Sequence, residues 1–161
     1  MQCSVHLPSQ FIAAHQNILL PSWPRPIGSM LLVLQPCACD LLGQTAEIER
    51  QKQRLRIEFL AFGSAVADRL EQLGHLAEVF DPRTGQPSRS QPGALSLDDV
   101  AVVRSCLDYS TIVYGECWSI VHPDWGSAVY PSTLLSSAAP AVVATVCDRV
   151  QQQHSVAIES A

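Results

Sequence analysis

The side chains best able to do chemistry gather in one stretch of the chain, from Tyr114 to Tyr130. This stretch contains Glu116, Cys117 and His122, together with two of the three Trp and two of the three Tyr residues. Aromatic residues make up only 6% of the chain, so their crowding predicts either a functional site or the centre of the core. A thiolate at Cys117 could ligate a soft or borderline metal ion, or act as a nucleophile.

Cys117 stands between Glu116 and Trp118 in a β-rich segment. Because side chains alternate along a strand, Cys117 is expected to face away from both neighbours unless a bulge intervenes. The carboxylate of Glu116 also disfavours a thiolate beside it. The residues by themselves therefore favour a core cysteine, while the roles of ligand and nucleophile stay open.

His122 and Trp125 flank a Pro-Asp pair that indicates a turn. A catalytic pair of His122 with Cys117 would need a sharp bend, since five residues of extended strand span roughly 16 Å. We expect His122 to cap the turn, and Trp125 either to stack on a flat ligand or to pack across a hairpin. The sequence has no glycine-rich phosphate loop, HExxH helix or GxSxG elbow, which argues against a self-contained enzyme.

The surrounding pattern predicts a single α+β domain over residues 1–150 and a flexible tail over residues 151–161. Apolar runs and turn residues predict strands at Ser4–Leu7, Met30–Leu34, His75–Phe80, Thr111–Val121 and Ser127–Tyr130, with an edge strand within Gln44–Gln53. Helical spacing and stop signals predict helices at Gln10–Leu20, at Leu55–Leu73, from a Ser96 cap to Leu107, and from Pro140 onward. Pro131–Ala139 is expected to be an irregular connection.

Charge and composition exclude some classes of function. The net charge is -5, and basic residues are nowhere dense enough to predict binding to nucleic acid. No apolar run approaches the ~20 residues of a membrane span, and the first residues carry no secretory pattern, so we expect a cytoplasmic protein with six reduced cysteines.

Cys37 and Cys39 form a Cys-x-Cys pair, which could hold a soft metal ion but is more simply two thiols at a loop.

Two blocks of sequence are similar to a known family. The first is Leu73–Gly85, with a helix end, an aromatic-containing strand and an Asp-Pro-Arg-Thr-Gly turn. The second is Gly115–Gly126, followed by Ser136–Pro140, and Glu47–Arg50 adds weaker similarity. In their order and spacing these blocks resemble the C-terminal globular domain of the methylmalonic aciduria and homocystinuria type D (cblD) family of cobalamin-trafficking proteins.

The resemblance implies a modified nitroreductase-like α+β fold without flavin, in which helices flank a mixed or antiparallel sheet. It implies a non-enzymatic adaptor that binds a cobalamin-loaded cblC-type processing protein and directs vitamin B12 toward methionine synthase or methylmalonyl-CoA mutase. The residues then expected to contact cobalamin are Glu116, Cys117, Trp118, His122 and Trp125, with Cys117 as a cobalt ligand.

One position departs from the family pattern, which has two adjacent Cys after the glycine, the first able to ligate cobalt. Here Glu116 precedes Cys117, and a carboxylate is a harder ligand than a thiolate. Either Cys117 reaches the cobalt through a local bulge, or partner binding does not use this bond. Two other functions stay open: a flavin- or cobalamin-dependent reductase or thiol transferase on the same fold, and a scaffold or dimerisation domain without a small ligand.

Overall fold

The computed structural model describes residues 1–159, and the surroundings of side chains in residues 1–154. It is an α+β structure built on an antiparallel four-stranded sheet with the strand order β1-β2-β6-β3. The four strands are β1 (Gln2–His6), β2 (Ser29–Pro36), β6 (Val129–Ser136) and β3 (Ala77–Val79). Two further strands, β4 (Ser110–Tyr114) and β5 (Cys117–Val121), form a separate hairpin. The α+β class and the antiparallel sheet are thus as predicted.

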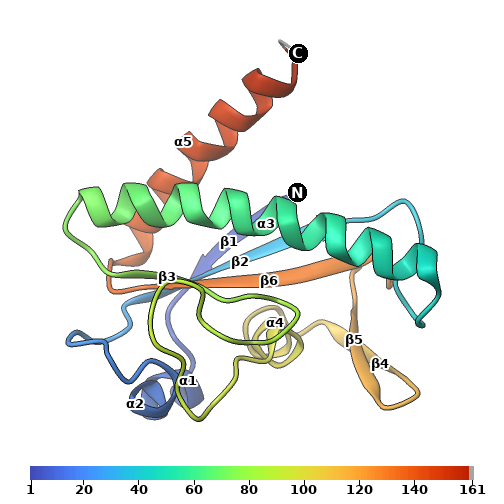
Figure 1. Cartoon of the computed structure of the whole chain (residues 1–161), viewed down its shortest axis with the longest axis horizontal. Helices are drawn as coiled ribbons and strands as arrows, with labels where there is room; N and C mark the ends of the chain where they lie inside the picture. Colours follow the sequence, from blue (N-terminus) through green and yellow to red (C-terminus); the bar gives the residue numbers. More distant parts are fainter. Residues whose placement is uncertain (160–161) are drawn as a thin grey trace.

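Helices cover both faces of the sheet (Figure 1). On one face lie α3 (Ala46–Gln72) and α5 (Pro140–Glu159), and on the other lie α1 (Gln10–Ala14), α2 (Gln16–Leu19) and α4 (Asp99–Leu107). Strand β2 explains this arrangement because it is apolar on both sides. Its Leu31 and Val33 pack with α3 and α5, whereas its alternate residues pack with α1, α2 and α4. The predicted buried strand at Met30–Leu34 is confirmed.

Helix α3 begins earlier than predicted, so the expected edge strand within Gln44–Gln53 is wrong. The Thr45 side chain accepts a hydrogen bond from the Ile48 amide, and Glu47 and Glu49 occupy the acidic first turn. The segment is polar because it faces solvent, and pairs such as Arg50 with Glu47 support it along the helix. The predicted stop is confirmed, since Gly74 follows the helix with a φ of 85°.

Four other boundaries also differ from the sequence-based expectations. The expected helix Gln10–Leu20 is divided into α1 and α2 at His15. The cap of α4 is Asp98 and not Ser96, since the Asp98 side chain accepts from the Ala101 amide at 3.1 Å. The expected strand Thr111–Val121 is folded into the hairpin. Helix α5 continues to Glu159, while residues 160–161 of the expected tail lie outside the described part.

Strand β6 is the largest correction. The expected irregular connection after Tyr130 is instead a central strand, paired with β2 along its whole length and with β3 at its end. Pro131 is tolerated because it lies where β6 has no neighbour on the β3 side. Thr133, two residues later, accepts a hydrogen bond from Phe80 on that side, so the missing amide of Pro131 faces the open edge.

Candidate functional site

The β4–β5 hairpin carries the predicted site residues at its tip. Tyr114 pairs with Cys117 across a two-residue turn made of Gly115 and Glu116. Gly115 has a φ of 62°, and the first position of a two-residue hairpin turn of type I′ or II′ requires a positive φ. The pairing runs without interruption from Tyr114 and Cys117 to Ser110 and Val121. The bulge considered for Cys117 is therefore absent from this hairpin.

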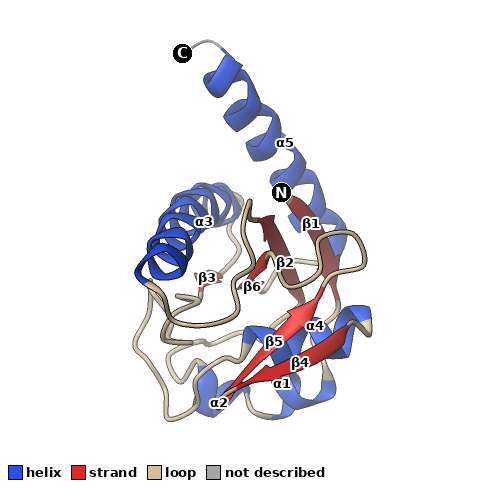
Figure 2. Ribbon diagram, turned by 90° about the vertical axis from the view of Figure 1, so that its right-hand side faces the viewer, coloured by secondary structure: helices blue, strands red, loops and turns tan. Residues whose placement is uncertain are grey.

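The hairpin is buried at its base and exposed toward its tip. Ile120 is fully buried, and β5 packs against α4 there, whereas Tyr114 is 58% and Trp118 59% exposed. Figures 1 and 2 show the hairpin extending away from the four-stranded sheet. Cross-strand pairing places Trp118 beside Val113 on one face, and Cys117 beside Tyr114 on the other. Cys117 is exposed, so the expectation of a core cysteine is wrong.

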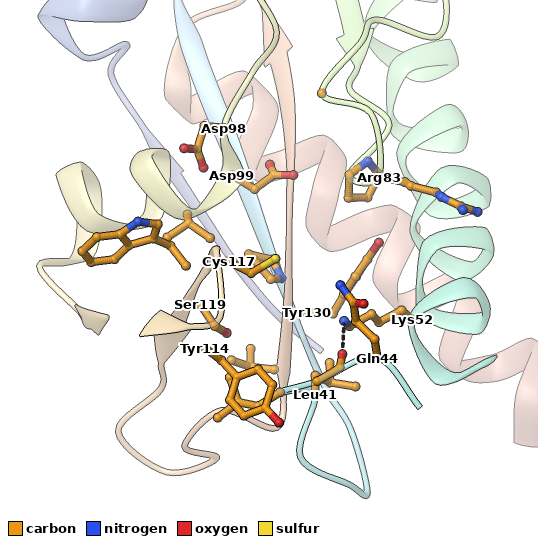
Figure 3. Close-up of a pocket in the computed structure, with 18 of the residues that line it drawn as sticks. Leu41, Gln44, Lys52, Arg83, Asp98, Asp99, Tyr114, Cys117, Ser119 and Tyr130 are labelled. Carbon is orange, nitrogen blue, oxygen red and sulfur yellow. Dashed lines mark hydrogen bonds between the residues drawn. The ribbon is translucent and has the colours of Figure 1, made fainter. Parts of the chain in front are cut away.

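A pocket of about 830 Å³ lies next to the thiol of Cys117. Its walls come from the hairpin tip, from residues 41–44, from the first turns of α3, from residues 82–85 and from the start of α4. Figure 3 shows the Cys117 sulfur directed into this space. The Lys52 ammonium group donates to the carbonyl of Gly43 at 3.2 Å, which ties α3 to the wall formed by residues 41–44.

The turn at residues 81–85 is fixed to α3 by an ion pair. The Arg56 guanidinium donates to both carboxylate oxygens of Asp81, and this hydrogen bonding lowers the pKa of Asp81. Gly85, at the end of the turn, has a φ of 68°, and a Cβ there would lie 2.4 Å from the Leu97 carbonyl oxygen. The predicted turn is confirmed, and it sets Arg83 at the rim of the pocket.

A buried carboxyl group also lines the pocket. Asp99 is 9% exposed, and its Oδ1 accepts a hydrogen bond from the Thr133 hydroxyl at 2.6 Å. Burial raises the pKa of Asp99 to about 7, against the smaller opposing effect of that hydrogen bond. Burial likewise raises the pKa of Tyr130 to about 12. Near neutral pH the pocket thus contains a phenol that keeps its proton and a carboxyl group able to exchange one.

His122 and Trp125 lie outside this pocket, in a second cluster. His122 is 3% exposed, and its Nδ1 accepts from the amides of Asp124 at 3.0 Å and Trp125 at 3.3 Å. Its Nε2 can then donate to Gln2 Oε1 at 3.0 Å, and the ring stacks on Trp125 with centroids 4.0 Å apart. The predicted capping role of His122 is confirmed. Neither ring nitrogen is free for a metal, so the structure does not bring His122 and Trp125 to Cys117.

The pocket also contains groups from other elements that no sequence pattern indicates as site residues, above all Asp99, Tyr130 and Lys52. Asp99 was visible only as an acidic residue near a helix start, and Tyr130 only as a strand end.

Within the described residues, no group of three or more His, Cys, Asp or Glu side chains could hold a metal ion. In the same part of the chain, none of the helices has the length and apolar character that a membrane span needs. Comparisons with protein-family models and with curated proteins give no match to this chain.

Proposed function

We propose that the chain is a cytoplasmic, non-enzymatic cobalamin-trafficking adaptor with a modified nitroreductase-like fold that uses no flavin. It binds a cblC-type processing protein loaded with cobalamin, and helps to direct the cofactor to methionine synthase or methylmalonyl-CoA mutase. The observation that supports this proposal most is the exposed thiol of Cys117, held at a hairpin tip and directed into a large pocket.

The thiol of Cys117, directed into the pocket, is the group that would hold cobalamin in this proposal. When bound, cobalamin would supply a cobalt ion able to take a thiolate ligand, and Cys117 would offer the soft donor for it. Glu116 occupies the turn, is exposed and offers a harder ligand. Cobalamin is also larger than the drug-sized ligands that pockets of roughly 300–1,000 Å³ enclose. The chain would therefore cover one part of the cofactor, while the partner protein holds the rest.

The other face of the hairpin supplies a contact surface for the partner. Trp118 and Val113 lie side by side there and are 59% and 51% exposed. Exposed apolar groups of this kind mark interaction sites, and Trp is among the residues that contribute most to protein interfaces. Trp118 also lines the pocket, so in this proposal it anchors the partner at the edge of the pocket, while Cys117 faces the cofactor that the partner presents.

Mixing the purified chain with a cblC-type protein carrying aquocobalamin tests the proposal. We expect co-elution in gel filtration and a change in the visible spectrum of the cobalamin. Cys117→Ser should abolish the spectral change while the complex still forms, and Cys106→Ser, which alters a half-buried thiol of α4, should change neither result. The absence of both complex and spectral change with the unaltered chain would contradict the proposal.

A second candidate function is a thiol-dependent transferase or reductase on the same fold. It is favoured by Asp99, since a carboxyl group with a pKa of about 7 lines the same pocket as Cys117 and could act as a general acid or base. Turnover of an alkylcobalamin with a small thiol, in the absence of any partner protein and lost in Asp99→Asn, would support this function over the adaptor. A yellow purified protein would support a flavin-dependent form of it.

A further inference from the structure

A second pair of sulfur atoms lies where β2 ends. Cys37 directly follows Pro36, the last residue of the strand, and its amide donates to the Ala128 carbonyl at 2.9 Å. Cys39 follows two residues later, and the two sulfur atoms are 3.6 Å apart in a thiol–thiol hydrogen bond. Both cysteines are only half-buried, so small reagents can reach them.

The chain on either side of Cys39 is held in place. After the pair, the Asp40 carboxylate accepts from the Ser127 hydroxyl at 2.8 Å and from the Leu42 amide at 2.9 Å. The Leu41 amide donates to the Ser127 carbonyl. Anchors at Cys37 and at Asp40 keep the two sulfur atoms close, and the residues that follow form the pocket wall at Leu41–Gly43.

The geometry is favourable for disulfide formation without movement of the sheet. A disulfide needs its sulfur atoms about 2.05 Å apart, so the pair at 3.6 Å must close by roughly 1.5 Å. Both cysteines lie beyond Pro36, the last residue of β2, so the closure takes place in the loop after the strand. The hydrogen bond to Cys37 raises the pKa of Cys39, with burial as the next contribution. In the reduced pair, Cys39 therefore loses its proton at a higher pH than an isolated thiol would.

We propose that Cys37 and Cys39 are a redox-active dithiol, which a low-molecular-weight disulfide of the glutathione type oxidises to an intramolecular disulfide. One protein thiolate attacks a sulfur of the small disulfide, forms a mixed disulfide and releases one small thiol. The second protein thiolate then attacks the protein sulfur of the mixed disulfide and releases the other small thiol. Two protein S–H bonds and one small S–S bond become one protein S–S bond and two small S–H bonds.

The other cysteines of the chain differ from this pair in ways that make them internal controls. Cys117 is exposed, and Cys106 contacts the Ser105 hydroxyl at 3.7 Å; within the described residues, neither is hydrogen-bonded to a second thiol. Cys147 in α5 is 2% exposed and packs in the core, where Cys3 contacts it. Among the described residues, the pair at the end of β2 is the one in which both bonded thiols are half-buried, because the partner of the half-buried Cys3 is the buried Cys147. The proposal does not depend on cobalamin binding.

The test uses the full chain, oxidised glutathione, alkylation of the remaining thiols and peptide mass mapping. We expect the peptide containing Cys37 and Cys39 to lose two hydrogens and to carry no glutathione, while Cys117 carries a stable mixed disulfide. Cys37→Ser and Cys39→Ser should each leave glutathione attached to the remaining thiol, and Cys106→Ser should still form the internal disulfide. The proposal is overturned if both thiols of the unaltered chain are stably glutathionylated, or if both stay alkylatable while Cys117 is modified.

Discussion

The tip of the β4–β5 hairpin and the turn at His122 come from the same aromatic-rich stretch, yet they have opposite characters. At the tip, Tyr114, Cys117 and Trp118 are exposed. At the turn, His122 is buried, uses both ring nitrogens and stacks on Trp125. Clustering of chemically capable residues thus does not mean that they act together. One half of the stretch presents side chains to solvent and the pocket, and the other half holds the hairpin in place.

A change of pH should alter the free energy of unfolding through Asp99, the buried carboxyl group that lines the pocket beside the hairpin tip. Burial raises the pKa of Asp99 from 3.8 to about 7. The folded chain then keeps this proton where the unfolded chain loses it, so the contribution of Asp99 to the free energy of unfolding falls as pH rises across that window. We expect the free energy of unfolding to fall by on the order of 4 kcal/mol, because each unit of difference between the folded and unfolded pKa corresponds to about 1.36 kcal/mol. Urea unfolding at several pH values measures it.

Asp99→Asn is the informative variant for that experiment, because an amide accepts from Thr133 but does not ionise. The variant should gain stability relative to the unaltered chain as pH rises from 4 to 8. Asp98→Asn is the matched control, since Asp98 is exposed and Asn caps a helix equally well. Parallel pH profiles for the unaltered chain and Asp99→Asn would show that Asp99 is not the titrating group.

Removal of the His122 side chain should destabilise the fold more than any change at the hairpin tip. His122→Ala loses the hydrogen bonds to two turn amides and to Gln2, and also the stack with Trp125. We expect a cost of about 3 kcal/mol in the free energy of unfolding. Denaturant titration measures the cost, and Glu116→Ala at the exposed tip serves as the control. Equal unfolding midpoints for the two variants would remove the distinction between the two regions.

Trp118→Ser should affect binding rather than stability. Trp118 is 59% exposed on the free chain, so little packing is lost on substitution. If it anchors the partner, affinity for a cblC-type protein should fall by about 2 kcal/mol, or roughly 30-fold. Isothermal titration calorimetry measures the affinity, with thermal unfolding as the check on folding. Unchanged affinity in a folded variant would move the partner surface away from this face.

The smallest expected change concerns the thiol itself. Cys117→Ser should alter the free energy of unfolding by no more than about 0.5 kcal/mol, because the side chain is exposed. Cys147→Ser places a hydroxyl in the core beside Cys3 and should cost about 1–3 kcal/mol. In the native protein a maleimide should modify Cys117 and spare Cys147, as read by mass spectrometry. Protection of Cys117 from the reagent would contradict its position at the tip.

Several elements could be predicted because their signals are local. The apolar run Met30–Leu34 can be buried only if both faces of its strand are covered, and the stop of α3 at Gly74 follows from the conformational freedom of glycine. The Asp81–Gly85 turn and the cap by His122 likewise need only neighbouring residues. Prediction failed at β6, because Pro131–Ala139 was expected to be an irregular connection, whereas Pro131 is accommodated at an open sheet edge and the strand continues to Ser136.

The sequence by itself determined the α+β class, the long helix, the main turns and the stretch where reactive side chains gather, because these depend on the spacing of residues close together in the chain. Only the tertiary structure decided that Cys117 is exposed and that Asp99, Tyr130 and Lys52 meet it around one pocket. These groups come from α4, β6 and α3. Their approach depends on pairing and packing between distant segments, which no local pattern encodes.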